Sequence, residues 1–167
     1  MPKSDQGAFV NRYKIIPRTL IFITKGDFIL LLKGAPDKRL WANRYNGVGG
    51  HVERGEDVLS AAKRELLEET GLQTDLHLCG TVLVDASDEV GIGLFVFRGE
   101  YENGELLQSR EGQVAWIAVE KLDQFPLVED LVILLPRVLG MKKGEQPFSG
   151  RSYYDENEQL HLEFSQP

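Results

Sequence analysis

The stretch GHVERGEDVLSAAKRELLEETGL, at residues 50–72, determines how the rest of the chain is interpreted. Residues 55–57 (GED) predict a turn that leads into a helix, and Gly71 predicts the C-terminus of that helix. Three apolar residues recur between these ends at helical spacing: Leu59, Ala62 and Leu66. The sequence therefore predicts an amphipathic helix whose apolar side faces a core.

Three glutamates lie on another side of the same helix. At about 100° per residue, Glu65, Glu68 and Glu69 span roughly one quadrant, away from the apolar residues. Carboxylates this close repel one another unless a cation lies among them, and hard oxygen ligands suit Mg²⁺ or Mn²⁺. For the glutamates alone, the competing interpretation is a solvated acidic surface.

The spacing of the fixed residues extends the pattern beyond these glutamates. Gaps of five, seven, one and one residues separate the groups Gly50, Glu56, Arg64-Glu65-Leu66, Glu68-Glu69 and Gly71-Leu72. This pattern resembles the Nudix box at every fixed position, and chance agreement is on the order of one in a billion per starting point. The resemblance to the Nudix hydrolases implies an α+β fold, an α/β/α sandwich with a mixed β-sheet between helices.

Length and composition predict one soluble domain over residues 1–167. Hydrophobic residues make up 42% and charged residues 27%, which is ordinary for a globular protein. No run approaches the roughly 18 apolar residues of a membrane span, and the N-terminus lacks the apolar region of a signal peptide. The single cysteine, Cys79, excludes an internal disulfide, and its apolar neighbours predict a buried thiol. We expect a cytoplasmic protein that does not bind membranes.

The net charge of −7 comes from 19 basic and 26 acidic residues. Such a surface should repel polymeric nucleic acid, and the sequence offers no basic stripe. The expected partner is therefore a small-molecule nucleotide, held with local help from a metal ion and nearby basic side chains. The sequence leaves monomer and homodimer open.

Apolar runs and turn signals predict the other elements. Hairpins are expected at residues 19–24 with 28–33 and at 147–154 with 160–164. Further strands are expected at residues 75–85 paired with 91–100, and at 113–119. Residues 128–139 predict a helix that Pro136 should kink or shorten, and the residues on its apolar face are Leu131, Leu134, Leu135 and Val138.

Two segments before the box predict ligand contacts. Residues 34–43 predict a loop that overhangs a site, and Lys33, Lys38, Arg39 and Arg44 around it are candidate phosphate contacts or solvated loop charges. Residues 45–50 (YNGVGG) allow the backbone to approach a ligand closely. A plain turn is the alternative for these glycines.

The resemblance assigns catalytic and metal-binding roles by position. Nudix enzymes hydrolyse a nucleoside diphosphate linked to a further group, with divalent ions held by carboxylates. The resemblance implies Glu68 and Glu69 as the main metal ligands, the carbonyl of Gly49 as another, and Glu65 as ligand or base. Glu111, in the loop before a late strand, is the second candidate for base and metal ligand; a solvated loop glutamate is the alternative.

Two further box residues have supporting roles. Arg64 lies four residues before Glu68, so we expect it to brace that carboxylate. Glu56 either turns toward the metal cluster as a ligand or favours the helix dipole.

Substrate choice follows from a closer resemblance to the MutT-type members. There an Asn beside the Gly-Gly run and an acidic pair before the last helix contact the base, which implies Asn46 and Glu129-Asp130. If these carboxylates share a pocket, one should hold its proton and donate to a purine; the alternative is that they only open the helix. Leu127 departs from the human-type members, which carry a stacking Trp nearby. Tyr45 and Trp41 are candidates for the missing aromatic face, and core or loop packing is the alternative for each.

The sequence thus predicts a Mg²⁺-dependent (or Mn²⁺-dependent) pyrophosphohydrolase. Its expected substrate is a purine nucleoside triphosphate, oxidised forms such as 8-oxo-dGTP included, and its products are the monophosphate and pyrophosphate. One alternative substrate is ADP-ribose, a dinucleoside polyphosphate or another nucleotide conjugate. A non-catalytic nucleotide-sensing module is a further alternative, which the complete set of box glutamates disfavours.

Overall fold

The computed structural model describes residues 7, 11–37, 39–107, 112–142 and 144–165. Within these residues, eight strands form one sheet, and helical segments lie on either side of it. In chain order the elements are β1 (Lys14–Lys25), β2 (Phe28–Gly34), β3 (Tyr45–Asn46), α1 (Val58–Thr70), β4 (Leu76–Val84), β5 (Val90–Glu100), β6 (Gly112–Ala118), the 3₁₀ helix η2 (Val119–Gln124), α2 (Leu131–Gly140), β7 (Phe148–Tyr154) and β8 (Leu160–Phe164).

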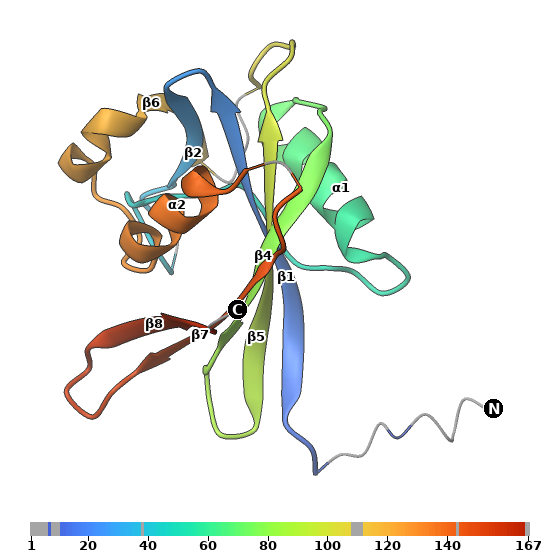
Figure 1. Ribbon diagram of the computed structural model, residues 1–167, viewed down its shortest axis with the longest axis vertical. Coiled ribbons are helices and arrows are strands. Elements are labelled where there is room, and N and C mark those ends of the chain that lie inside the picture. The colour runs from blue at the N-terminus through green and yellow to red at the C-terminus, as the bar shows by residue number, and fades with distance from the viewer. Residues whose placement is uncertain (1–6, 8–10, 38, 108–111, 143, 166–167) are drawn as a thin grey trace.

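The sheet is mixed, as predicted. Its strand order is β3-β2-β1-β5-β4-β7-β8, and β6 pairs with β2 (Figure 1). Strand β1 runs parallel to β5 from the pair Lys14↔Val90 to the pair Thr24↔Glu100, and β4 runs parallel to β7. The other strand pairs are antiparallel. The long β1–β5 pair therefore joins the two ends of the sheet.

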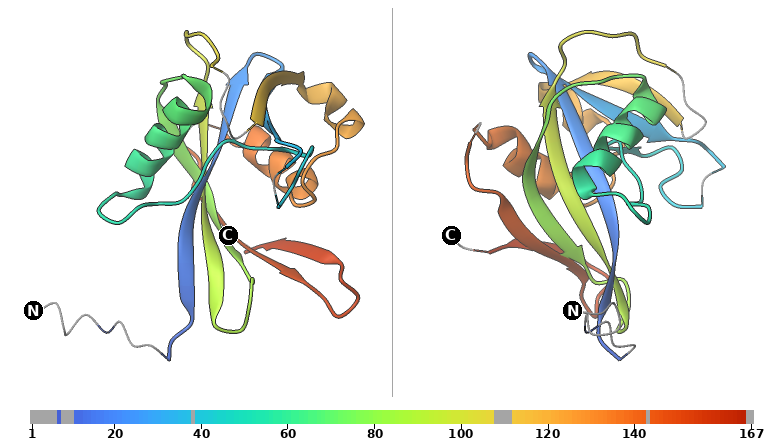
Figure 2. Two further views of the ribbon diagram at one scale, coloured as in Figure 1. Left: turned by 180° about the vertical axis from the view of Figure 1, so that it is seen from behind. Right: turned by 90° about the vertical axis from the view of Figure 1, so that its right-hand side faces the viewer.

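Alternate residues of β1 enter two separate cores, because successive side chains of a strand point to opposite faces. Leu20 and Phe22 pack with the apolar residues of α2, whereas Ile21 and Ile23 pack with those of α1. Figure 2 shows the two helices on opposite sides of the sheet. The predicted α/β/α sandwich is confirmed, and the middle of β1 is covered on both faces.

Helix α1 begins and ends where the sequence predicts. Asp57 is its N-cap and accepts hydrogen bonds from the N–H groups of Leu59 and Ser60 at 2.9 and 3.0 Å. Gly71 ends it in the left-handed conformation, with φ of 77°. One expectation was wrong: Leu59 is 37% exposed. Its place beside the cap directs it to solvent, and Val58 packs against the core instead.

Helix α2 starts later than predicted, at Leu131 instead of residue 128. Its four expected core residues are buried: Leu131, Leu134, Leu135 and Val138. Pro136 lies inside the helix and does not end it. The proline removes the hydrogen bond to the carbonyl of Val132, a residue 65% exposed, so the affected turn faces solvent.

The predicted strand pairs at β4–β5 and β7–β8 are confirmed. The first predicted hairpin, at residues 19–24 with 28–33, is confirmed only in part. Residues 23–25 of β1 pair with residues 28–30 of β2, and the pairing goes no further. Strand β1 also begins earlier than predicted, at Lys14, and its main partner is β5.

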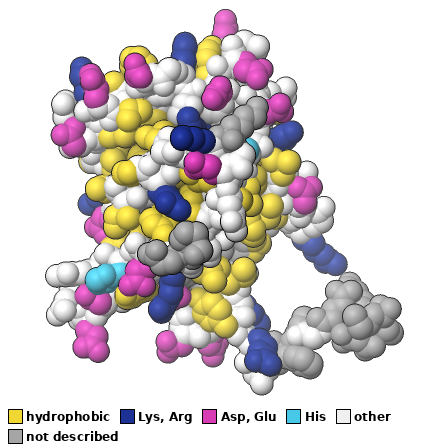
Figure 3. Space-filling model, in the orientation of Figure 1, with side chains coloured by type: hydrophobic (Ala, Val, Ile, Leu, Met, Phe, Trp, Pro, Cys, Tyr) yellow, Lys and Arg dark blue, Asp and Glu magenta, His cyan; other side chains and the backbone are white. Residues whose placement is uncertain are grey.

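The core agrees with the expectation for the single cysteine. Cys79 is fully buried, and burial raises the pKa of its thiol to about 11. Figure 3 shows Lys and Arg side chains scattered among acidic ones on the face that it displays. Among the described residues, no helix is both long enough and apolar enough to cross a membrane.

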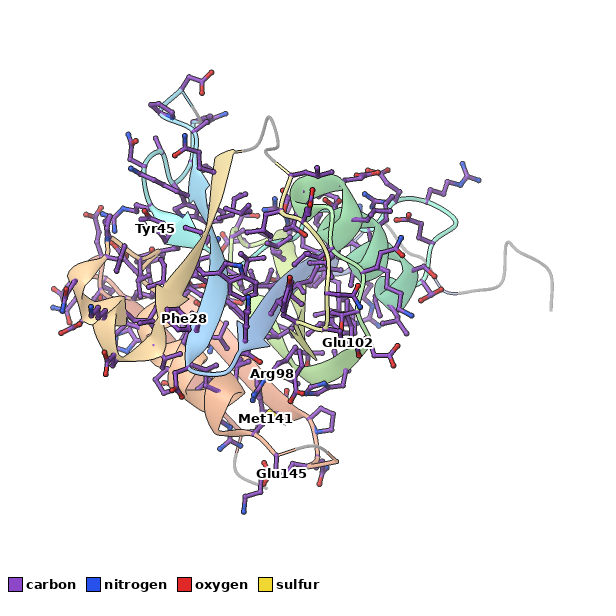
Figure 4. All side chains as sticks on the ribbon, turned by 90° about the horizontal axis from the view of Figure 1, so that it is seen from above. Phe28, Tyr45, Arg98, Glu102, Met141 and Glu145 are labelled. Carbon is purple, nitrogen blue, oxygen red and sulfur yellow. The ribbon has the colours of Figure 1, made fainter. Side chains whose placement is uncertain are left out.

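A half-buried arginine, Arg98, joins β5 to the end of α2. The Nη1 of Arg98 lies within 3.1–3.3 Å of the carbonyl oxygens of Val138, Leu139 and Met141. Figure 4 shows Arg98 directed toward Met141 from the sheet. The last carbonyls of a helix have no partner within it, and they carry partial negative charge that a guanidinium stabilises. Arg98 therefore fixes the C-terminus of α2 against the sheet.

Replacing Arg98 with Met should lower the free energy of unfolding by about 1–3 kcal/mol, because the helix carbonyls lose charge-assisted hydrogen bonds. Urea unfolding followed by circular dichroism measures this change. Arg151→Met, which removes an exposed pair with Asp85, is the matched control and should shift the midpoint little. Equal midpoints for Arg98→Met and the wild type would contradict this assignment.

Candidate active site

Helix α1 carries the three box glutamates to the glycine-rich segment at residues 47–50. The side chain of Glu68 is 59% exposed and that of Glu65 is 15% exposed. Glu69 is buried, with 6% of the residue exposed. The N–H of Gly49 donates a 2.9 Å hydrogen bond to Glu69 Oε2. A solvated acidic surface does not account for this arrangement, because protein covers two of the three carboxylates.

Two glycines allow this close approach. Gly49 has a φ of +146°, and a Cβ there would lie 2.2 Å from the carbonyl oxygen of Thr19. A Cβ on Gly50 would lie 2.4 Å from Glu65 Oε1. The segment is fixed to β1 by hydrogen bonds that include Thr19 N–H to Gly50 O at 2.8 Å. A side chain at Gly49 would clash with the backbone of β1, and a side chain at Gly50 would clash with Glu65 of α1.

Arg64 connects the carboxylates around the start of α1. Its Nε and Nη2 donate to the two oxygens of Glu56 at 2.7 and 3.0 Å. Its Nη1 donates to Glu65 Oε1 at 2.8 Å and to Glu68 Oε2 at 3.2 Å, and Nη2 also donates to the carbonyl of His51. The expected contact with Glu68 is present, but Arg64 binds Glu56 more closely. This guanidinium lowers the pKa of Glu56 to about 2.

A cleft of about 570 Å³ lies beside the box carboxylates. This volume is within the range of about 300–1,000 Å³ typical of ligand sites. Its lining includes Glu65, Glu68, Glu69, Gly49, Gly50, Asn46, Trp41, Arg18 and Arg44. Negative and positive groups therefore share one cleft, an arrangement that suits a phosphate ligand accompanied by a cation.

A second, smaller hollow adjoins the cleft. Trp41 and Arg44 line both, and Glu129 and Asp130 line the second, whose volume is about 210 Å³. Tyr154 O–H donates a hydrogen bond of 3.2 Å to Glu129 Oε2. Burial raises the pKa of Asp130, in the direction expected for a carboxyl that keeps its proton. The acidic pair thus lines one hollow, which is the condition that the sequence analysis set for one of the two carboxyls to hold a proton.

The structure does not bring every candidate to these hollows. Lys33 lines neither: its neighbours on β2, Leu32 and Gly34, line the cleft, and the side chain of Lys33 lies on the opposite face of the strand. Its Nζ lies 5.9 Å from the centre of the Tyr45 ring. Glu56 is also outside the cleft lining, with both oxygens bonded to Arg64. Glu111 lies outside the described residues.

Of the two aromatic candidates, only Trp41 reaches the hollows. Tyr45 packs edge-on against Phe125, with ring centres 5.3 Å apart, and lies against the α2 core. The loop that carries Trp41 is closed by hydrogen bonds of 3.0 Å, from Gly34 N–H to Arg44 O and from Asn43 N–H to Gly34 O.

The donor set suits a hard divalent cation. Glu65, Glu68, Glu69 and the backbone of Gly49 offer oxygen atoms, the ligands that Mg²⁺ and Mn²⁺ prefer. In the part of the chain that the structure describes, no three His, Cys, Asp or Glu side chains are grouped closely enough to hold a metal. The geometry gives a reason: Nη1 of Arg64 draws Glu65 and Glu68 toward itself. Because Glu68 is largely exposed, it has room to turn from Arg64 to an ion.

Some lining residues had no sequence signal. Arg18 belongs to a segment of β1 that the hydrophobic pattern missed, and only the pairing of β1 with the box segment places it in the cleft. Tyr154 lies more than 100 residues from Trp41 in sequence and joins the second hollow through the sheet.

Comparisons with known proteins agree with this site. Residues 14–138 match the NUDIX domain. An oxidized purine nucleoside triphosphate hydrolase from Danio rerio is 32% identical over 127 residues, which are 75% of this chain and 80% of that protein. The NAD-capped RNA hydrolase NudC from Pseudomonas syringae is 29% identical over 116 residues, 68% of this chain, and the chain spans 40% of its length.

Structural comparison supports the same fold. The crystal structure of a MutT protein from Bacillus halodurans has a TM-score of 0.76 at 24% identity, and the match covers 92% of this chain and all of that one. The box residues, strands β1 to β6 and helix α1 lie within the matched NUDIX region. Helix α2 overlaps the end of that region, and β7 and β8 follow it. The chain therefore belongs to the Nudix hydrolase family, whose enzymes cleave diphosphate bonds and generally use divalent metal cations.

Proposed function

We propose that this protein hydrolyses purine nucleoside triphosphates, oxidised ones included, to the monophosphate and pyrophosphate, with Mg²⁺ or Mn²⁺ as cofactor. The observation that carries the proposal is that the carboxylate cleft and the hollow of Glu129 and Asp130 are adjoining and share Trp41 and Arg44. One ligand can therefore place its phosphates at the box and its base at the acidic pair. The 32% identity to an oxidized purine nucleoside triphosphate hydrolase supports this choice.

The box residues would hold the cation. Glu68 and Glu69, with Glu65 and the carbonyl of Gly49, supply its oxygen ligands in our proposal. When bound, a divalent ion neutralises charge on the phosphates and lowers the pKa of a coordinated water. Gly49 N–H fixes the carboxylate of Glu69, so this ligand needs no rearrangement. We propose Glu65 or Glu111 as the base that accepts a proton from the attacking water.

Arginines have two separate roles in this proposal. Arg18 and Arg44 line the cleft and bind phosphate oxygens, since guanidinium groups match their geometry. Arg64 is a positioning residue: Glu56 holds it in place, and it in turn orients Glu65 and Glu68.

The base is read by an amide and a protonated carboxyl. Asn46 Oδ1 accepts a 2.8 Å hydrogen bond from Gly47 N–H, which orients the amide so that its NH₂ group acts as the donor to the ligand. Burial raises the pKa of Asp130, a shift that favours the protonated carboxyl; in our proposal this group donates to a purine acceptor while Glu129 accepts from a purine N–H. A purine presents both donors and acceptors on its edges, which suits this pair.

A nucleotide conjugate is the second candidate substrate class. The similarity to an NAD-capped RNA hydrolase favours it, and ADP-ribose and dinucleoside polyphosphates fall in the same class. The net charge of −7 disfavours polymeric RNA as a substrate, because an acidic surface repels the phosphate backbone. The same assay measures hydrolysis of the small conjugates and hydrolysis of the triphosphates.

The substrate assay measures product release over a nucleotide panel. We expect the highest kcat/KM for purine nucleoside triphosphates, with pyrophosphate released only when Mg²⁺ or Mn²⁺ is present. Phosphate detection after treatment with inorganic pyrophosphatase measures the reaction, and pyrimidine triphosphates, ADP-ribose and dinucleoside polyphosphates complete the panel. Absence of metal-dependent turnover of every triphosphate would exclude the proposed function.

Replacing Glu68 with Gln should lower kcat roughly a hundredfold or more, because an amide is a poor ligand for the cation. The side chain is mostly exposed, so the unfolding midpoint should change little. Glu120→Gln, which removes an exposed carboxylate on η2, is the control and should keep wild-type activity. If Glu68→Gln and wild type have the same kcat at every Mg²⁺ concentration, Glu68 is not a metal ligand.

Replacing Glu56 with Gln should make the free energy of unfolding fall less steeply as the pH is lowered from about 4.5 toward 2. Folding lowers the pKa of Glu56 from its ordinary 4.5 to about 2. A carboxyl with a lowered folded-state pKa stabilises the fold above about pH 4.5, and this contribution is lost as the pH falls toward 2. Urea unfolding between these pH values should show a shallower decline for the variant than for wild type and for Glu120→Gln. Identical slopes would mean that the Arg64 pairing is not formed in solution.

A further inference from the structure

The C-terminal hairpin β7–β8 lies beyond the segment that matches the NUDIX domain, which ends at residue 138. It is nevertheless fixed to the body of the protein. Strand β7 pairs in parallel with β4 over five residue pairs, from Gly80↔Phe148 to Val84↔Ser152. Phe148 is buried in the α2 core, and its ring packs edge-on against Phe164 at 5.2 Å. The hairpin thus presents its side chains from a defined position.

One face of this hairpin forms a wall of the second hollow. Tyr154 and Leu160 are cross-strand partners, so their side chains lie on the same face. Both line the hollow, as does the buried Ser152. The next residue, Tyr153, points to the opposite face and donates a 2.9 Å hydrogen bond to Glu163. Strand alternation therefore separates two tyrosines of the hairpin into a lining residue and an outer one.

The chemistry of this hollow favours a flat heterocycle over a phosphate. Glu129 and Asp130 line this hollow and not the cleft, whereas Arg44, its one cation among the described residues, is shared with the cleft; an ionised Glu129 would repel an anion. Its volume of about 210 Å³ is below the range of about 300–1,000 Å³ for whole ligands, so it suits one part of a ligand. The ring of Trp41, 45% exposed, lies where the hollow meets the cleft. Aromatic and aliphatic walls with hydrogen-bonding groups between them are the usual surroundings of a nucleobase.

We propose that the β7–β8 hairpin selects the nucleobase: Tyr154 and Leu160 form one wall of the base pocket, and the Tyr154 hydroxyl positions Glu129 to accept a hydrogen bond from the base. This inference rests on the proposed function and adds a specificity element from outside the matched domain. The 3.2 Å bond from Tyr154 O–H to Glu129 Oε2 occupies one carboxylate oxygen and restrains the side chain. The exposed glutamate would otherwise have several rotamers to lose on binding.

A pair of matched variants tests this role. Tyr154→Phe and Tyr153→Phe each remove one hydroxyl that is bonded to a glutamate of the chain, and each keeps its ring. We expect Tyr154→Phe to reduce the ratio of kcat/KM between purine and pyrimidine triphosphates roughly fivefold to tenfold, the scale of one lost hydrogen bond. The change should lie in KM, with kcat kept. Tyr153→Phe should retain the wild-type ratio, and a merely structural role for Tyr154 would lower activity on all bases equally.

Binding of a product without metal gives a readout that does not depend on hydrolysis. In calorimetry, a purine nucleoside monophosphate should bind the wild type and Tyr153→Phe alike, and bind Tyr154→Phe and Leu160→Ala severalfold more weakly. Ribose 5-phosphate should not distinguish the four proteins. If the wild type binds the monophosphate in this pattern but hydrolyses no triphosphate, the proposed function fails and the pocket stands. If Tyr154→Phe matches the wild type in base preference and in binding, or the wild type binds no monophosphate, the hairpin proposal is wrong.

Discussion

The hydrogen bond from Gly49 N–H to the buried carboxylate of Glu69 is the constraint on which the site depends. A buried carboxylate is costly unless donors satisfy it, and the donor here is backbone that only glycine allows so close to β1. The bond therefore fixes the glycine-rich segment to α1 and leaves Glu65 and Glu68 at the edge of the cleft. The same contact explains why glycines and glutamates occur together in one pattern. The glycines let the backbone approach closely, and the glutamate accepts the hydrogen bond that this backbone donates.

The sequence was most informative where neighbouring residues decide the structure. The turn that leads into α1, the helix end at Gly71 and the β7–β8 hairpin follow from local chemistry, and the structure confirms them. Errors of a turn or less occurred at helix ends. Leu59 is exposed although its spacing fits the apolar side of α1, because it lies in the first turn beside the N-cap.

What the sequence could not supply is the pairing of distant segments. The parallel pairing of β1 with β5 joins residues about 76 positions apart in the sequence. Neither segment has a sequence pattern that indicates which strand it pairs with. Successive side chains of a strand point to opposite faces of the sheet, which is why Lys33, adjacent to two cleft residues, points away from the cleft. The family pattern supplied the box residues, but Arg18, Tyr154 and Leu160 enter their hollows only through the assembled sheet.

A protein of net charge −7 has to bind an anion, and the layout of the site offers a physical answer. The carboxylates of the box are grouped at one cleft, where Arg64 already offsets part of their charge, and Arg18 and Arg44 line the same cleft. Attraction is therefore local and short-ranged, since charges beyond about 10 Å are screened at ordinary salt. The acidic pair is kept apart in the second hollow, where negative charge repels phosphate. Under the proposed function, this layout orients a ligand with a phosphate end and a neutral, hydrogen-bonding end before any contact with the base is made.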